Sequence, residues 1–266
     1  MIPTFILSLL FLVGLLAGLV DSIAGGGGLI TIPVLLSIGL APQIALGTNK
    51  LQASFGSGSA MLTFIRSGKV RLGDCATGIV FTALGAAGGT FTVQLLDPAL
   101  LRRVIPWLLA AIAVYTITTP RLGFDDLHPR MRQNSFFLLA GVSLGFYDGF
   151  LGPGTGSFWV MALIFALGFN MTRATAYTKV MNFTSNVVSL AVFIIGGSVY
   201  WREGLIMGIG QFIGARIGAH LVVTKGTRFI RPVFITMVLA ITARLIWQNY
   251  HVINKPKNGS WFPLPC

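Results

Sequence analysis

The sequence is poor in acidic residues and in cysteine. Of its 266 residues, 7 are Asp or Glu and 19 are Lys or Arg, and only 10% are charged in total. The two cysteines, Cys75 and Cys266, give neither a metal-ligand spacing nor a disulfide framework. With 54% hydrophobic residues, a soluble protein of this size could not keep its apolar surface from water. These properties exclude a soluble enzyme, a nucleic-acid-binding domain and a disordered chain.

Long apolar segments separate the short groups of basic residues, as in multi-pass membrane proteins. A spanning helix needs about 20 apolar residues. The first candidate lacks the basic start and cleavage site of a signal peptide, so we interpret it as a membrane helix. Two shorter pieces, 29–40 and 157–169, each follow a glycine-rich stretch and could re-enter the membrane. The candidate spans are residues 2–20, 45–65, 73–95, 100–118, 133–151, 174–195, 203–223 and 229–247.

The chain contains an internal duplication. A shift of about 127–129 positions aligns Gly18-Leu-Val-Asp21 with Gly145-Phe-Tyr-Asp148, and residues 45–50 with 174–179. Because glycines and polar residues align as well as leucines, we predict two homologous halves in an all-α polytopic membrane protein. The predicted divisions are a first repeat 4–118, a loop 119–132, a second repeat 133–248 and a polar tail 249–266.

The charge distribution favours an inverted second repeat. If residues 66–71 are cytoplasmic, inversion places residues 119–132 and 225–231 on the same side, with three Lys or Arg in each group. This arrangement follows the positive-inside rule. Two inverted repeats with glycine-broken helices are a transporter architecture.

Each half has one aspartate and one lysine inside its apolar sequence, at matching positions. These are Asp21 and Lys50 in the first half, and Asp148 and Lys179 in the second. An ionisable residue in lipid costs at least ~2.5–3.5 kcal/mol, so it is a functional hypothesis by default. The lysines could attract an anion, while the aspartates could cap a broken helix or carry a coupled proton. The alternative is a structural use, in which lysine only neutralises a capping aspartate.

Two glycine-rich stretches, 24–28 and 152–156, interrupt the apolar sequence. Each glycine costs ~0.8–1.0 kcal/mol relative to alanine in a helix, so we predict two helix breaks. A helix that starts after each break would point free N–H groups inward, and such N-termini attract anions. Close helix packing is the alternative use of these glycines. The predicted substrate site comprises Lys50, Lys179, Asn49, Gln52, Ser22, Gly25, Gly26, Gly27, Gly28, Gly152, Gly154, Thr155, Asn182 and Asn186.

The helix after each break carries a polar stripe. Residues spaced by three and four share one face, which either joins helices or lines a pathway. The stripes are Asn49, Gln52, Gly56, Ser59 and Thr63, and Lys179, Asn182, Asn186 and Ser189. The Gly-x-x-x-Gly spacings at 85–89 and 214–218 indicate packing instead. Arg216 and His220 have no counterpart in the first half, and we expect them at the membrane interface rather than in the site.

These motifs resemble the TauE/SafE family of membrane permeases, also called the TSUP family. The resemblance covers residues 4–248 and implies a multi-pass permease of the bacterial inner membrane. It further implies transport of sulfite, sulfoacetate, sulfolactate or related organosulfur anions. The motifs that carry it are Gly18-Leu-Val-Asp21 with the glycines up to Gly28, Ile32-Pro33 and Gly47-Thr-Asn49-Lys50-Leu-Gln52, and two that are similar to YfcA-like members, Gly145-Phe-Tyr-Asp148-Gly-Phe and Gly210-Gln-Phe-Ile-Gly214-Ala-Arg216.

We therefore predict a secondary transporter of a small anion, with no cofactor, no metal and no nucleic-acid partner. The expected partners are the anionic substrate and the lipid bilayer, and a homo-oligomer is left open. The chain has no nucleotide-binding motif, which leaves ion gradients to drive transport. A passive anion channel and a non-transporting scaffold are alternatives. An intramembrane protease is disfavoured, because Tyr147-Asp148 has no partner Gly-x-Gly-Asp motif.

Overall fold

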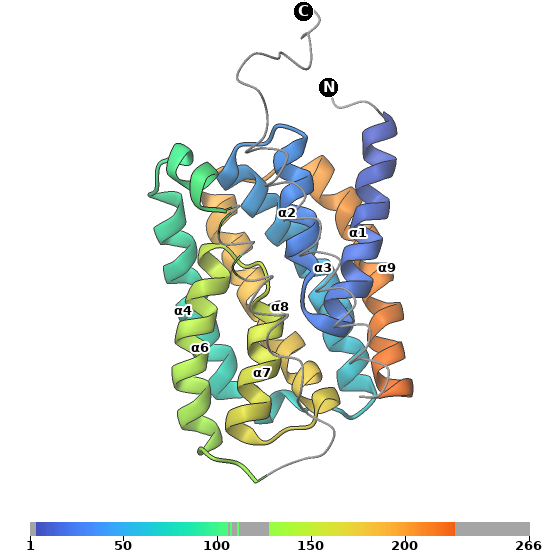
Figure 1. Ribbon diagram of the computed structural model, residues 1–266, viewed down its shortest axis with the longest axis vertical. Coiled ribbons are helices and arrows are strands. Elements are labelled where there is room, and N and C mark those ends of the chain that lie inside the picture. Colours follow the sequence, from blue (N-terminus) through green and yellow to red (C-terminus); the bar gives the residue numbers. More distant parts are fainter. Residues whose placement is uncertain (1–3, 106, 108–110, 112–127, 227–266) are drawn as a thin grey trace, which may run out of the picture.

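The computed structural model describes residues 4–105, 107, 111 and 128–226, and every regular element among them is helical (Figure 1). The predicted all-α fold is confirmed. Residues 98–105 are helical in addition to the labelled elements. In chain order these are α1 (Thr4–Ala24), α2 (Gly27–Ser37), α3 (Pro42–Arg66), the 3-10 turn η1 (Leu72–Cys75), α4 (Ala76–Gln94), α6 (Gln133–Phe150), α7 (Thr155–Leu167), α8 (Met171–Ile195) and α9 (Trp201–Lys225).

Residues suited to helix ends set several of these boundaries. Pro42 occupies the first turn of α3, where a missing N–H is no loss. The side-chain oxygen of Asn170 caps α8 by accepting from the backbone N–H of Arg173 at 2.9 Å. Gly168 ends α7 in the left-handed conformation, with a φ of 69°. The short connections that result fix where each following helix begins.

The two halves repeat the same order of helices. α3 and α8 each have 25 residues, and α8 begins about 129 positions after α3. The same shift takes the start of η1 to the start of α9. The helices α1–α4 therefore correspond to α6–α9. The C-terminal limits of the two predicted repeats, residues 118 and 248, lie outside the described residues, as do the span 229–247 and most of the span 100–118.

Corresponding helices run in opposite directions. Gly47 lies against Phe193, and Gly58, further along α3, lies against the earlier residue Phe183. α3 and α8 are therefore antiparallel. In Figure 1, α1, α3 and α9 run from top to bottom, whereas α4, α6 and α8 run from bottom to top. The second half is inverted relative to the first, as the charge distribution predicted.

Each half contributes a helix to a close pair with the other half. α1 packs in parallel against α9, and α4 packs in parallel against α6. Glycines permit the contact, because a side chain at these positions would collide with the backbone of the partner helix. The packing function predicted for the two Gly-x-x-x-Gly motifs is confirmed. The facing pairs include Gly14 with Met207, Gly18 with Gln211, Gly85 with Val142, Gly89 with Phe146 and Gly214 with Leu15.

α1 with α2, and α6 with α7, form hairpins that turn back inside the bundle (Figure 1). Leu7 near the start of α1 packs in one cluster with Leu35 near the end of α2. The backbone N–H of Arg130, just before α6, donates to the carbonyl of Ala166 at the end of α7 at 2.9 Å. The two short apolar pieces are therefore re-entrant half-helices, and the chain reverses at the glycine-rich breaks.

Four helical segments among the described residues are long and apolar enough to cross a membrane, and they match four of the predicted spans. α3 and α6 were also predicted to span. Both are helical, but they do not meet the same apolar criterion, and α3 buries the polar residues Asn49, Lys50 and Gln52 inside the bundle. The fold is that of an all-α multi-pass membrane protein. The four segments are Ile6–Ala24, Leu72–Gln94, Met171–Ile195 and Trp201–Lys225.

Basic residues gather at the end of the bundle where α3 and α9 finish and α6 and α8 begin. We call this the basic end. The opposite end has fewer, with Arg102, Arg103 and Arg202 among the described residues. The positive-inside rule predicts that the basic end faces the cytoplasm. Its residues are Arg66, Lys69, Arg71, Arg130, Arg132, Arg173 and Lys225.

Candidate functional site

The two glycine-rich breaks meet near the centre of the bundle. Gly25, Gly152 and Gly154 have φ angles of 77°, 88° and 77°, which favour glycine over residues with a side chain. A Cβ added to Gly25 would lie 2.5 Å from the carbonyl carbon of Gly156. The backbones of the two halves therefore touch at this point, which glycine alone permits.

The breaks are narrower than the sequence predicted. Gly27 and Gly28 belong to the first turn of α2, and Thr155 and Gly156 to the first turn of α7. Glycine is tolerated there because the first N–H groups of a helix need no intrahelical partner. Only Gly25 and Gly26 separate α1 from α2, while residues 151–154 separate α6 from α7.

The half-helices α2 and α7 both begin at these breaks and run to opposite ends of the bundle (Figure 1). Their N-termini are thus close together, with Gly28 against Pro153. Each helix N-terminus carries a partial positive charge of about half an elementary charge. Two such termini at one point create a positive potential inside the protein, as in transporters that bind anionic groups.

Lys50 on α3 forms the first buried ion pair, with Asp148 on α6. The two side chains lie 2.8 Å apart (Nζ to Oδ1), and they are 2% and 6% exposed. Asp148 also accepts hydrogen bonds from Thr155 at 3.3 Å and from Ser185. Lys50 makes a second bond, to the side-chain oxygen of Asn186 at 3.2 Å. This pair is deeply buried and its carboxylate has three side-chain donors.

Lys179 on α8 forms the second ion pair, with Asp21 on α1. The Nζ–Oδ2 distance is 2.9 Å, and the side chains are 1% and 15% exposed. The lysine also donates to the main-chain carbonyl of Asp21. The other carboxylate oxygen of Asp21 accepts a 3.3 Å bond from the backbone N–H of Gly27, at the start of α2. This aspartate therefore does cap a half-helix, through a longer bond than its ion pair.

Both ion pairs connect one half of the chain to the other. Lys50 of the first half is paired with Asp148 of the second, and Lys179 with Asp21 in the reverse sense. A buried charge without a partner would cost several kcal/mol. Because each pair joins the two halves, the lysine of each half depends on the aspartate of the other half for its partner. Together the four side chains carry no net charge.

The remaining predicted site residues divide into three groups. Asn182 and Asn186 lie at the centre, with Asn182 beside Gly156 and Asn186 bonded to Lys50. The side-chain oxygen of Asn49 accepts from Gln52 at 2.7 Å and from Thr31 of α2 at 2.6 Å, so these residues hold α2 against α3. Ser22 lies away from both ion pairs in the hydrogen bonds that it makes. Its hydroxyl donates to the carbonyl of Leu19 at 2.9 Å and lies against Gly218, in the contact between α1 and α9.

Sequence reasoning missed residues that hold the first ion pair. Ser185 donates to Asp148, and Ser57 lies 3.3 Å from the amide nitrogen of Asn186. Ser185 follows the predicted Asn182 by three positions and therefore shares its helical face. The spacing of three residues could have identified Ser185 from the sequence. The stripe on α3 is partly packing, since Ser59 bonds the carbonyl of Phe212 on α9 at 2.9 Å.

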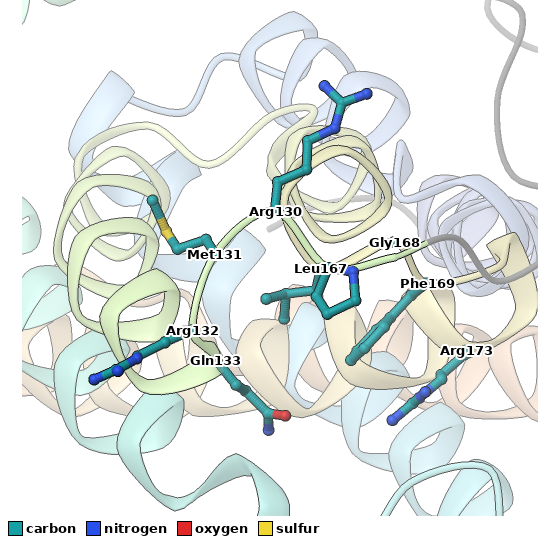
Figure 2. Close-up of a pocket in the computed structure, with 9 residues that line it drawn as sticks. Arg130, Met131, Arg132, Gln133, Leu167, Gly168, Phe169 and Arg173 are labelled. Carbon is teal, nitrogen blue, oxygen red and sulfur yellow. The ribbon is translucent and has the colours of Figure 1, made fainter.

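A cavity of about 600 Å³ opens at the basic end, between the starts of α6 and α8 and the end of α7. Figure 2 shows Arg130, Arg132 and Arg173 at separate points around it, with Leu167 and Phe169 between them. The guanidinium of Arg173 stacks 3.9 Å from the centre of the Phe169 ring. The residues of the two central ion pairs do not line this cavity, so it is a basic vestibule rather than the central site.

Two inverted halves, re-entrant half-helices and charges paired across a buried centre define a membrane transporter. Comparison with known proteins agrees. The family model "Sulfite exporter TauE/SafE" matches residues 10–245. The chain belongs to the TauE/SafE family.

Several curated relatives have similar lengths. A protein of Haemophilus influenzae named "Probable membrane transporter protein" is 47% identical over 244 residues, 92% of this chain and 96% of that protein. The Escherichia coli K12 protein "Probable membrane transporter protein YfcA" is 44% identical over 250 residues, 94% and 93% of the two chains. Bacillus subtilis YunE is 25% identical over 269 residues, 91% and 97%. No solved structure matches the chain. These names point to transport rather than to an enzyme.

Proposed function

We propose that the protein is a secondary transporter of a small anion, either a sulfur oxyanion, an organosulfonate or a carboxylate. The observation that carries the proposal is the central arrangement, where the N-termini of α2 and α7 meet beside Lys50 and Lys179. The family description adds sulfite as the first substrate to test.

The electrostatics of the centre favour one added negative charge. The two lysines and two aspartates cancel, whereas the two helix N-termini add about +0.5 each. A lysine ammonium is a compact point charge with three donors, which suits the oxygens of a sulfonate, sulfite or carboxylate. The glycines let an anion approach the main-chain N–H groups closely.

An entering anion competes with the aspartates for the lysines. Asp21 is the easier one to displace, because it is more exposed than Asp148 and has one weak backbone donor besides Lys179. Asp148 has Lys50 and two hydroxyls. We therefore place the substrate at Lys179, with a proton on Asp21 restoring the charge balance. This mechanism couples anion movement to protons moving in the same direction.

Alternating access follows from the inverted halves. Because each hairpin opens toward a different end of the bundle, rocking one half against the other would expose the centre to one side at a time. The central side chains are almost fully buried in this structure, which corresponds to a closed arrangement.

The test is sulfite flux into proteoliposomes that contain the purified full-length protein. We expect Lys50→Ala with Lys179→Ala to reduce the flux at least ~100-fold, as loss of two charge-assisted contacts implies. The control is Arg202→Ala, which removes one basic residue in the first turn of α9, away from the central ion pairs. This variant should transport normally. Monodispersity in detergent establishes that each variant is folded. Unchanged flux in the double variant would refute the site.

Two further measurements separate coupled transport from a channel. Flux through a transporter saturates with anion concentration, whereas single-channel currents without saturation indicate a channel. An inward proton gradient should accelerate anion uptake in the wild type, and Asp21→Asn should abolish that acceleration. Persistent acceleration in Asp21→Asn would exclude Asp21 as the proton carrier.

A further inference from the structure

A second cavity of about 600 Å³ lies at the basic end, between the last turn of α3 and the final turns of α9. Its polar groups come from Arg66, Arg216 and His220, and its apolar wall from Ile217, Leu221 and Val223. The central site does not use these residues. We call this cavity the α3–α9 groove.

The packing of α3 against α9 explains why the basic groups gather there. The two helices run in the same direction, and the hydroxyl of Ser59 bonds the carbonyl of Phe212 at 2.9 Å. Arg66 lies about as far along α3 from Ser59 as His220 lies along α9 from Phe212, so the two residues are at the same depth in the bundle. Arg216 lies one turn deeper on the same face of α9 as His220. The groove therefore has Arg66 and His220 at its mouth and Arg216 further inside.

This face of α9 is directed toward lipid. Arg216 and His220 are exposed, and the neighbouring Ile209, Ile213 and Ile217 are 54%, 41% and 47% exposed. In a membrane protein, such apolar side chains meet acyl chains. The groove thus combines an apolar wall suited to an acyl chain with guanidinium groups suited to a phosphate.

Arg216 lies nine residues before the end of α9, which is about 13 Å along a helix. An arginine at membrane depth is unfavourable unless it has a partner. Among the described residues, no carboxylate lies within ion-pair distance of Arg66 or Arg216. An anionic ligand would supply the missing negative charge.

The opposite end of the bundle has no such groove chemistry. A shift of about 129 positions takes Arg66 to Ile195, Arg216 to Ala87 and His220 to Phe91, all uncharged. Arg66, Arg216 and His220 thus have no basic counterparts at the equivalent positions near the opposite end, and the positive-inside rule predicts that their own end faces the cytoplasmic leaflet, which is rich in anionic lipid. The groove residues therefore differ from their counterparts in the other repeat, and they lie at the end of the bundle where anionic headgroups are expected.

We propose that the α3–α9 groove binds an anionic phospholipid. Its phosphate lies between Arg66 and Arg216, and an acyl chain follows Ile217 and Ile213. Arginine suits this function because its planar fork binds phosphate oxygens in pairs. The site is separate from the central ion pairs and does not depend on what the protein transports.

The experiment is native mass spectrometry of the full-length protein in detergent, titrated with phosphatidylglycerol, cardiolipin or zwitterionic phosphatidylcholine. The wild type should retain the two anionic lipids in preference to phosphatidylcholine. Arg66→Ala with Arg216→Ala should bind them about 10- to 30-fold more weakly, from about 1 kcal/mol for each basic residue. Arg102→Ala with Arg202→Ala removes the same charge at the opposite end and should bind like the wild type.

Three results would overturn the proposal. The first is equal retention of anionic and zwitterionic lipids by the wild type, and the second is undiminished binding by Arg66→Ala with Arg216→Ala. The third is displacement of the lipid by millimolar inorganic phosphate, which would identify a site for a free anion. Should the alanine variant fail to fold, Arg66→Gln with Arg216→Gln keeps a polar, hydrogen-bonding side chain without the charge and serves the same comparison. Transport of sulfite is measured separately, so its absence leaves this test intact.

Discussion

The two central ion pairs occupy equivalent positions in the repeats but have different surroundings. The Lys50–Asp148 pair is almost closed off from solvent, and two hydroxyls hold its carboxylate. The Lys179–Asp21 pair leaves its carboxylate 15% exposed, with one backbone donor 3.3 Å away. Duplication of the sequence has thus preserved the charges while their supporting residues diverged.

The difference in burial and in hydrogen-bond donors gives the two ion pairs different resistance to disruption. Separating an ion pair costs more free energy when its carboxylate is buried and has several hydrogen-bond donors. A partly exposed carboxylate exchanges partners more easily. The surroundings of Asp148 therefore suit an anchor between the two halves, and those of Asp21 suit the exchange with substrate and proton proposed above. The pairs can be distinguished by how strongly each resists disruption.

The largest expected effect comes from removing one aspartate at a time. Asp148→Ala leaves the buried Lys50 without its carboxylate partner and should destabilise the protein by about 3–5 kcal/mol. Asp21→Ala should cost clearly less, about 1–3 kcal/mol, because solvent can reach the vacated position. Thermal unfolding in detergent, followed by tryptophan fluorescence, measures both. Equal losses would remove the distinction between the two pairs.

A smaller effect should show that the halves remain equivalent in packing. Gly85→Ala and Gly214→Ala each place a methyl group against the backbone of the partner helix, at Val142 and Leu15. Both should lose about 1–3 kcal/mol by overpacking. Gly88→Ala is the control, because its nearest contact would be 3.7 Å away, on the ring of Phe146. Dissimilar losses at positions 85 and 214 would show that the helix pairs also diverged.

The smallest effect concerns the residue before each lysine. Asn49 accepts bonds from Thr31 and Gln52, whereas its counterpart Thr178 has a buried hydroxyl without a hydrogen-bond partner among the described residues. Thr31→Val should cost about 1–2 kcal/mol by leaving Asn49 under-bonded. Thr178→Val should be neutral or stabilising. Denaturation midpoints of the two valine variants provide the comparison, and a costly Thr178→Val would indicate a function for that hydroxyl.

Much of this architecture was predictable from the sequence. Hydrophobic runs and repetition located the helices and the two Asp–Lys sets, because these are properties of the sequence itself, and the distribution of basic residues predicted the inversion. The pairing was not predictable, because each lysine had two chemically identical aspartates to choose from. Only the folded structure brings Lys50 of α3 to Asp148 of α6 and Lys179 of α8 to Asp21 of α1.

Two details also required tertiary structure. Ser22 looked like a site residue because it follows Asp21, yet the helical turn directs its hydroxyl to Leu19 and α9. The glycines at positions 27 and 28 looked like a break, yet helical first turns need no backbone partner and accept them. Sequence proximity and residue propensity were both outweighed by where the helices pack.

The exchange of helices between halves has a consequence for biosynthesis. Among the described helices, α1 has its close parallel partner in α9, with Gly14 facing Met207, so roughly 200 residues separate the two surfaces. At about 5–20 residues per second, a ribosome needs some 10–40 s to supply the missing helix. During that interval the glycine face of α1 has no partner from its own chain. The first half cannot finish folding before the second is made, and the nascent chain must wait in the membrane as an incomplete assembly.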